Sequence, residues 1–181
     1  MPAARSRSRQ AAERRWGWHR LDESTARYVV GRAGIRPGDL VVDLGAGTGA
    51  LTGALTEVGA RVVAVERHPQ RVTLLRARFA DLPVTVVAAD IGRLRLPRRP
   101  FRVVANPPWA MAESIRSMLL RSPSLARADL VLPRWLVRHW AAESPRIGIG
   151  PSIRAEAFVP PAPTGAAVAI ISGPRPKSGR R

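Results

Sequence analysis

The sequence contains no cysteine, and this absence excludes disulfide bonds, thiolate zinc sites and cysteine nucleophiles. The three histidines, His19, His68 and His139, lack the spacing of metal ligands, so we expect no metal site and place these side chains on the surface. No apolar run approaches the roughly 20 residues that cross a bilayer, and the basic N-terminus lacks the apolar segment of a signal peptide. These absences favour a cytoplasmic protein without a membrane partner.

Lysine is nearly absent, although the chain is strongly basic. The 181 residues include 30 Lys and Arg against 13 Asp and Glu, a formal net charge of +17, and Lys177 is the only lysine. Arginine binds phosphate with two N–H groups and stacks on bases, and a net charge of this size attracts polyanions. Nucleic acid is therefore the expected partner, with arginine-rich codon usage as the alternative cause of the composition.

The length of 181 residues fits one domain, and a hydrophobic fraction of 45% is enough to build a core. Residues 1–15 are rich in Arg, Ser and Ala without a long apolar pattern, which predicts a flexible basic arm. Residues 173–181 combine Pro, Gly, Ser and Arg and predict a disordered basic tail. We therefore expect the folded domain over residues 16–172 and no helical domain behind it.

Short apolar runs alternate with helical patterns between these two ends. Runs rich in β-branched residues suit strands buried on both faces of a parallel sheet, and strand–helix alternation predicts an α/β fold. We expect strands at residues 40–45, 61–66, 84–90, 101–106, 129–133 and 167–171, the last paired in a hairpin with residues 153–158. We expect helices at residues 24–33, 50–58, 69–79, 112–121 and 134–142.

A glycine-rich turn follows the first predicted strand, which ends at Asp43. Its glycines, Gly45, Gly47 and Gly49, let the backbone bend tightly and approach a ligand. A carboxylate before these glycines would repel a pyrophosphate, whereas it suits the amino group of an amino-acid ligand. Glu66 ends the next strand, where a carboxylate reaches the hydroxyls of a ribose. These residues predict a site for a nucleoside-bearing cofactor.

Two further strand ends carry candidate ligands. Asp90 follows the third strand and is placed to accept a hydrogen bond from a cofactor adenine, with a helix cap or turn role as the alternative. The fourth strand ends in Asn106, Pro107 and Trp109. The Asn106 side-chain oxygen and the Pro107 carbonyl can accept from one amine, and Trp109 offers a face on which a base stacks. The alternative, a proline-rich loop beside a core tryptophan, does not explain the glycine-rich turn.

This combination resembles the amino-methyltransferases of the S-adenosylmethionine superfamily. More closely, the chain resembles the Erm-type ribosomal RNA adenine N6-methyltransferases, relatives of the rRNA adenine dimethylases, over roughly residues 14–172. The WGWHRL segment, the DLGAGTGALT turn, VVANPPW and the later FVPPAP segment carry the likeness. The chain departs from the family in the second proline and the tryptophan of its Asn-Pro motif, in WHRL where an SQNF-like stretch is usual, and in lacking room for the usual C-terminal helical domain.

The resemblance implies a class I methyltransferase fold, with a mostly parallel seven-stranded sheet that ends in an antiparallel hairpin. It implies catalysis without a metal by Asn106, Pro107 and Trp109. It also implies S-adenosylmethionine as cofactor. The residues expected to bind it lie at the ends of the four strands discussed above: Asp43, Gly45, Gly47, Gly49, Glu66, Asp90 and Asn106.

The implied substrate is adenine N6 in ribosomal RNA, specifically 23S RNA at the macrolide-binding site, with antibiotic resistance as the consequence. We expect a monomer in which RNA contacts come from Trp109, Phe158, Arg14, Arg15, Trp18 and Arg20. The alternatives are a strand end for Phe158 and a core or lid position for Trp18. On the helix at residues 134–142, a solvated basic face with core tryptophans is expected.

Two other functions stay open on the sequence alone. One is an amino-methyltransferase acting on DNA or on protein glutamine, because the basic arm suits DNA as well. The other is a ribosomal RNA-binding or assembly factor that has kept the fold and lost catalysis.

Overall fold

The computed structural model describes residues 19–174. The predicted arm, Trp16, Trp18 and most of the predicted tail therefore lie outside the described residues. The boundaries of the folded domain at these two ends stay predictions.

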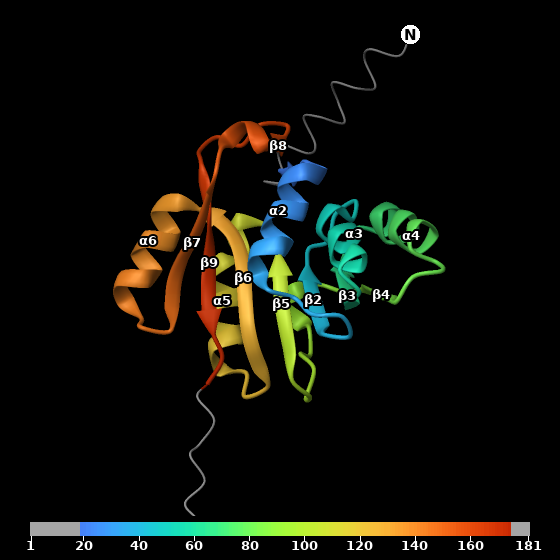
Figure 1. Ribbon diagram of the computed structural model, residues 1–181, viewed down its shortest axis with the longest axis horizontal. Coiled ribbons are helices and arrows are strands. Elements are labelled where there is room, and N and C mark those ends of the chain that lie inside the picture. Colours follow the sequence, from blue (N-terminus) through green and yellow to red (C-terminus); the bar gives the residue numbers. More distant parts are fainter. Residues whose placement is uncertain (1–18, 175–181) are drawn as a thin grey trace, which may run out of the picture.

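The main sheet has seven strands in the order β4-β3-β2-β5-β6-β9-β7 (Figure 1). Strands from β4 to β6 run parallel to their neighbours, whereas β9 lies antiparallel between β6 and β7. The predicted mostly parallel sheet with a final antiparallel pair is thereby confirmed. The strands are β2 (Leu40–Leu44), β3 (Arg61–Glu66), β4 (Val84–Ala88), β5 (Phe101–Ala105), β6 (Leu125–Pro133), β7 (Ile147–Ile153) and β9 (Ala166–Ser172).

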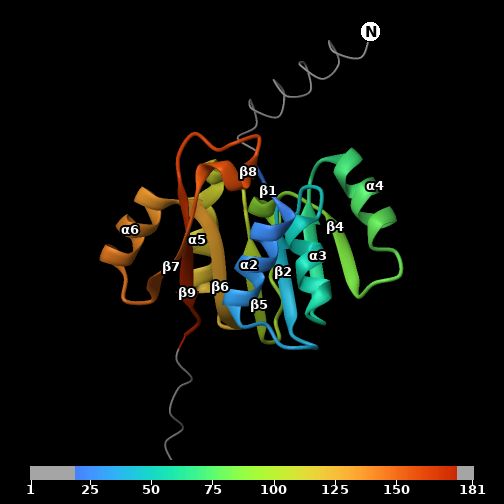
Figure 2. The same ribbon diagram turned by 45° about the horizontal axis from the view of Figure 1, so that its top comes forward.

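Helices cover both faces of this sheet (Figure 1, Figure 2). On one face, Val30 and Leu55 pack with Val41 of β2, and on the other Ile115 and Val137 pack in the core with β5. Strands buried on both faces need continuous apolar runs, which is the pattern of the central strands. The helices are α2 (Glu23–Ala33), α3 (Ala50–Glu57) and α4 (Pro69–Arg78) on the first face, and α5 (Ala112–Arg121) and α6 (Arg134–Glu143) on the second.

The strand expected at residues 153–158 was placed wrongly. The edge strand β7 spans Ile147–Ile153 instead, and it pairs with β9 through a bulge between Ile149 and Ser152. Two glycines and Pro151 weaken the strand pattern of this segment. A proline is tolerated there because an edge strand and a bulge do not need every N–H group for the ladder.

A second, two-stranded sheet joins the start of the described chain to the segment between β7 and β9. β1 (Arg20–Leu21) pairs antiparallel with β8 (Phe158–Val159), after the short 3-10 helix η3 (Ala155–Ala157). Arg20 lies opposite Val159, and Leu21 lies opposite Phe158. This pairing was not predicted, and it brings residues 19–21 and the FVPPAP segment to the same edge of the main sheet (Figure 2).

The two tryptophans of α6 have different surroundings. Trp140 is fully buried, and its indole N–H donates to Glu113 of α5, so its predicted core position is confirmed. Trp135 is 65% exposed, so the expectation of a second core tryptophan was wrong. Leu136, Val137 and Trp140 already fill the buried face of the helix, which leaves Trp135 on the opposite side.

Candidate active site

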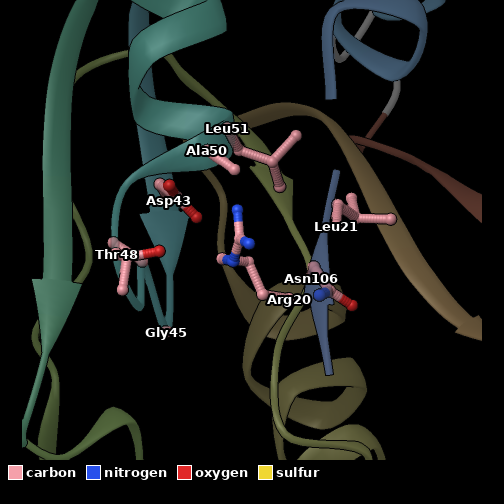
Figure 3. Close-up of a pocket in the computed structure, with 9 residues that line it drawn as sticks. Arg20, Leu21, Asp43, Gly45, Thr48, Ala50, Leu51 and Asn106 are labelled. Atoms are coloured by element: carbon pink, nitrogen blue, oxygen red, sulfur yellow. The ribbon is translucent and has the colours of Figure 1, made fainter. Parts of the chain in front are cut away.

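The candidate residues Asp43, Glu66 and Asn106 lie at or directly after the carboxyl ends of β2, β3 and β5, which are parallel neighbours in the sheet (Figure 1). In an open α/β sheet, the carboxyl ends of the strands form the ligand crevice. A pocket opens there between the glycine-rich turn, the loop after β5 and strand β1 (Figure 3). Its lining includes Asp43, Gly45, Asn106 and Arg20.

The glycine-rich turn packs tightly against its neighbours. Gly45 has φ 79° and Gly49 has φ 91°, a region that favours glycine. A Cβ on Gly45 would lie 3.1 Å from Cδ of Pro108, and one on Gly49 would lie 2.6 Å from Cε2 of Phe79. The turn therefore touches the loop that carries Asn106, so that the two motifs found in the sequence form one site.

Asp43 is a buried carboxyl at the end of β2, with 1% exposure. Burial raises its pKa to about 7, because the opposing hydrogen bond of 2.7 Å from Thr52 Oγ1 is outweighed and the charge of Glu66 adds to the rise. Thr52 was missed by the sequence analysis, which did not look beyond the glycines into α3. A buried carboxyl of this kind can bind a cationic group once it ionises.

Glu66 is held by three backbone N–H groups. Its Oε2 accepts from Gly47 at 3.0 Å, and its Oε1 accepts from Arg67 at 2.9 Å and from His68 at 2.8 Å. The side chain thus braces the glycine-rich turn from the next strand. Its place at the strand end agrees with the position expected of a ribose ligand, and that role stays a prediction.

Asp90 takes the turn role that was its alternative. Its Oδ1 accepts from the Gly92 N–H at 2.8 Å at the start of the 3-10 helix η1 (Ile91–Arg93), and its Oδ2 pairs with Arg67 at 3.2 Å. The Gly92 N–H first, and then Arg67, hold the pKa of this carboxyl below its usual value. A contact with a cofactor adenine stays a prediction.

Asn106 is oriented by a backbone group. Its Nδ2 donates to the carbonyl oxygen of His19 at 2.6 Å, which leaves Oδ1 as the acceptor of the amide. Pro107 is buried beside it, and Trp109 opens the 3-10 helix η2 (Trp109–Met111) that follows. Asn106 therefore offers its Oδ1 as an acceptor, and the next residue, Pro107, offers only its carbonyl because proline has no N–H group.

Three rings meet next to this loop. The ring of Trp109 lies 6.1 Å from that of Phe158 in an edge-to-face arrangement, and the His19 ring lies 5.8 Å and 6.4 Å from them, centroid to centroid. His19 Nδ1 is also 3.3 Å from the Pro160 carbonyl. His19 is half-buried, since the pairing of β1 with β8 carries its ring into this cluster. Phe158 is 1% exposed and lies in the short strand β8, in agreement with its alternative interpretation as part of a strand end, and its contact with a base stays a prediction.

Arg20 was expected to contact RNA, and its side chain extends into the pocket toward Asp43 and Leu51 (Figure 3). Arg20 therefore lines the same pocket as Asp43, Gly45 and Asn106. The other predicted RNA contacts, Arg14, Arg15 and Trp18, lie outside the described residues.

Within residues 19–174, no three His, Asp or Glu side chains come together as a metal site. None of the helices in that part of the chain is long and apolar enough to cross a membrane.

The sequence is similar to proteins named for ribosomal RNA methylation. Residues 17–148 match the family model described as Ribosomal RNA adenine dimethylase. The chain is 39% identical over 145 residues to Ribosomal RNA small subunit methyltransferase A of Leifsonia xyli subsp. xyli (strain CTCB07), covering 75% of this chain and 51% of that protein. It is 34% identical over 97 residues to an rRNA adenine N-6-methyltransferase of Bacillus licheniformis, covering 53% of this chain and 34% of that protein. The chain thus spans about half the length of the first relative and a third of the second.

The fold is similar to that of solved structures. The 23S rRNA methyltransferase ErmE superposes with a TM-score of 0.79 at 22% identity, over 90% of this chain and 72% of that one. A dimethyladenosine transferase from Plasmodium falciparum gives 0.74 at 17% identity, over 85% and 63% of the two chains. At these identities the likeness establishes the fold.

Proposed function

The chain belongs to the ribosomal RNA adenine dimethylase family, and from this premise we propose that it transfers a methyl group from S-adenosylmethionine to N6 of an adenine in ribosomal RNA. The observation that carries the proposal is the position of Asn106. Its amide is oriented by the His19 carbonyl, and its loop packs against the glycine-rich turn. One site thus contains both an acceptor for an amine and a turn that admits a closely bound ligand. Direct transfer of a methyl group between two bound molecules requires this arrangement.

S-adenosylmethionine fits the residues around the pocket. Asp43 presents a buried carboxyl to a cationic amino group, and Glu66 is held in place at the neighbouring strand end, where a ribose would lie. When bound, the cofactor supplies a methyl group on a sulfonium, which is already an activated donor. The proposed cofactor ligands are Asp43, Gly45, Gly47, Gly49, Glu66, Asp90 and Asn106.

The loop after β5 performs the chemistry on the base. Asn106 Oδ1 and the Pro107 carbonyl accept the two N–H groups of the adenine amine. The lone pair of this nitrogen is otherwise delocalised into the adenine ring. The two hydrogen bonds favour a pyramidal nitrogen, and they stabilise the positive charge that it carries after methyl transfer. Trp109 stacks on the base, holds it for attack and interacts favourably with the developing charge. The base leaves its own stack to reach this site.

No side chain with a tuned pKa is required for this step. A methylated amine on adenine loses its proton readily, so Asn106 and Pro107 need only position the nitrogen and stabilise its charge. The contribution of this chain to the reaction is therefore geometric and electrostatic, and we propose that it works as a monomer in the cytoplasm, where ribosomal RNA is found.

The narrower proposal is 23S RNA at the macrolide-binding site, with antibiotic resistance as the consequence. It is supported by the Erm-type motifs and by the fold shared with the 23S rRNA methyltransferase ErmE. Small-subunit RNA is the second candidate, because the Leifsonia relative is a small subunit methyltransferase and matches more of this chain than the Bacillus relative does.

The deciding experiment supplies the full chain with S-adenosylmethionine carrying a labelled methyl group and with large- and small-subunit RNA. Mass spectrometry of the digested RNA should find the label on adenine N6. Comparing methylated positions and macrolide susceptibility in cells with and without the protein then separates the two targets. Label on a ribose or a ring carbon, or no transfer to either RNA, would refute the proposal.

A further inference from the structure

A tryptophan side chain stands exposed on the first turn of α6. Trp135 is 65% exposed, more than any other large hydrophobic side chain among residues 19–174. Tryptophan is usually well buried because its large apolar surface is costly to leave in water. Its neighbours Leu136 and Val137 bind the helix to the core, so Trp135 is not needed there. Its exposed indole offers a flat face on which a nucleic-acid base can stack.

The first turn of α6, which carries Trp135, begins where β6 ends, at the edge of the sheet where the parallel strand β5 also ends (Figure 2). Asn106 directly follows β5 and α6 directly follows β6, and these two strands are parallel neighbours in the sheet. The Arg134 N–H also donates to the Gly165 carbonyl at 3.2 Å, which ties the helix to the loop that follows Phe158.

The surroundings of Trp135 are basic. Arg138 is one helical turn further along and exposed, and Arg154 is exposed where β7 ends at the same sheet edge. Neither of them, nor Arg134, forms an ion pair with any residue in the described part of the chain. The nearby carboxylate in sequence is the exposed Glu156 of η3. Three guanidinium groups against one carboxylate leave this edge available to phosphates.

We propose that Trp135, Arg138 and Arg154 bind an unpaired nucleotide of the RNA substrate next to the target adenine. The indole stacks on the base, and the two guanidinium groups contact the phosphates on either side of it. The inference rests on the proposed function for the identity of the polymer, and it adds a contact outside the methyl-transfer pocket.

Single-stranded RNA fits this surface better than a duplex. An indole stacks on a base whose face is open, and the narrow major groove of an A-form helix does not admit side chains. The target adenine itself must be unpaired to enter the pocket, and unpaired neighbours are the bases that can reach the rim of the same site. The surface formed by Trp135, Arg138 and Arg154 is therefore expected to bind unpaired RNA next to the target adenine.

The test uses the full chain and a fluorescein-labelled single-stranded RNA of mixed sequence, with its blunt duplex as a second probe. Trp135→Ala should weaken binding of the single strand by about tenfold, whereas Trp135→Phe should keep most of it because a stacking face remains. Duplex binding should change less than about twofold. Arg138→Glu should weaken the single strand and lower its salt slope by about 0.7 for each lost phosphate contact. Two control variants should bind RNA as the wild type does. Tyr28→Ala removes an exposed aromatic side chain on α2, and Arg61→Glu reverses a charge at the start of β3, at the other end of the strands from the candidate site.

A second readout reports stacking itself. An RNA with 2-aminopurine beside the target position should be quenched by the wild type and by Trp135→Phe, and not by Trp135→Ala. Unchanged affinity and quenching in Trp135→Ala overturn the proposal, as does an equal loss on the duplex. Self-association of the wild type that Trp135→Ala abolishes, with RNA affinity unchanged, assigns the surface to a second copy of the chain and overturns it too.

The two proposals fail in different ways. Calorimetry with S-adenosylmethionine and methyl transfer by the wild type test the function without Trp135. If transfer occurs while Trp135→Ala binds and reacts normally, the nucleotide site is refuted and the function stands. If the single-strand defect is present while the wild type transfers no methyl group to ribosomal RNA, the site stands and the function is refuted.

Discussion

The Asn106 side chain donates a hydrogen bond of 2.6 Å to the backbone carbonyl of His19. The bond joins the loop after β5 to the segment that begins β1, and it decides which end of the amide stays available. The His19 ring lies 5.8 Å from the Trp109 ring at the same time. One residue thus positions both the amide acceptor and the aromatic platform, the first through its backbone and the second through its side chain.

Asn106→Ala should lower the single-turnover rate of methyl transfer by roughly a hundred- to a thousandfold, because it removes a preorganised polar group that acts on the transition state. Asn106→Asp should lose a similar amount, since an ionised carboxylate cannot donate to the His19 carbonyl. Binding of S-adenosylmethionine, followed by calorimetry, should stay measurable in both. His19→Ala is the matched control: it keeps the carbonyl and should raise the KM for RNA more than it lowers kcat. Near wild-type turnover in Asn106→Ala would contradict the assignment.

Gly49→Ala should destabilise the fold more than Gly38→Ala. Both glycines have positive φ, so both substitutions carry the backbone strain of about 1 to 2 kcal/mol. A Cβ at position 38 meets nothing within 4 Å, whereas one at position 49 would lie 2.6 Å from the Phe79 ring. The clash should cost about 1 to 3 kcal/mol more in the free energy of unfolding, measured in urea. Equal losses would show that Phe79 moves aside freely.

The local patterns of the sequence predicted the central strands and helices well. The runs that became β2, β3 and β5 are short, apolar and β-branched, and they can be read without knowledge of the rest of the chain. The glycine-rich turn and the Asn-Pro motif were likewise expected at strand ends. Their meeting at one pocket followed from the parallel arrangement of those strands.

The parts that were mistaken depend on contacts between distant segments. β1 and β8 are each two residues long, and neither shows a strand period by itself. Their pairing places His19 in an aromatic cluster and Arg20 in the pocket beside the glycine-rich turn. Trp135 and Trp140 are both apolar in the sequence, and only the packing of α6 against β7 and β9 decides which of them is buried.

The stability of the ligand-free protein should depend on the titration of Asp43. Its pKa rises from 3.8 to about 7 on folding, mainly through burial, so the folded state holds this proton more tightly than the unfolded chain does. Its contribution to the free energy of unfolding is therefore greatest at low pH and declines as the pH rises from 3.8 to 7. Urea unfolding measured across this pH range should show this decline in the free energy of unfolding for the wild type, and the decline should be absent in Asp43→Asn. Thr52→Val removes the hydrogen bond that opposes the rise in the folded-state pKa, so the decline should still begin near 3.8 and extend to higher pH.

Asp43→Asn should also separate cofactor binding from RNA binding. Loss of the carboxylate should weaken S-adenosylmethionine by roughly tenfold or more, because a charge-assisted hydrogen bond is lost. RNA affinity should stay near that of the wild type, since Asp43 is buried away from the surface. Calorimetry and fluorescence anisotropy measure the two affinities, and an unchanged affinity for the cofactor would contradict the cofactor site.

Arg20 decides between two interpretations of the WHRL segment. Its side chain lies in the pocket with Asp43, where its positive charge opposes the binding of a cationic ligand (Figure 3). Arg20→Gln, which keeps most of the length and removes the charge, should therefore raise the affinity for S-adenosylmethionine by about fivefold. RNA affinity and its salt slope should not change. Arg32→Gln is the control, since Arg32 is exposed in the last turn of α2. If Arg20→Gln instead lowers RNA affinity and the salt slope while cofactor binding is unchanged, the residue contacts RNA, as the sequence alone predicted.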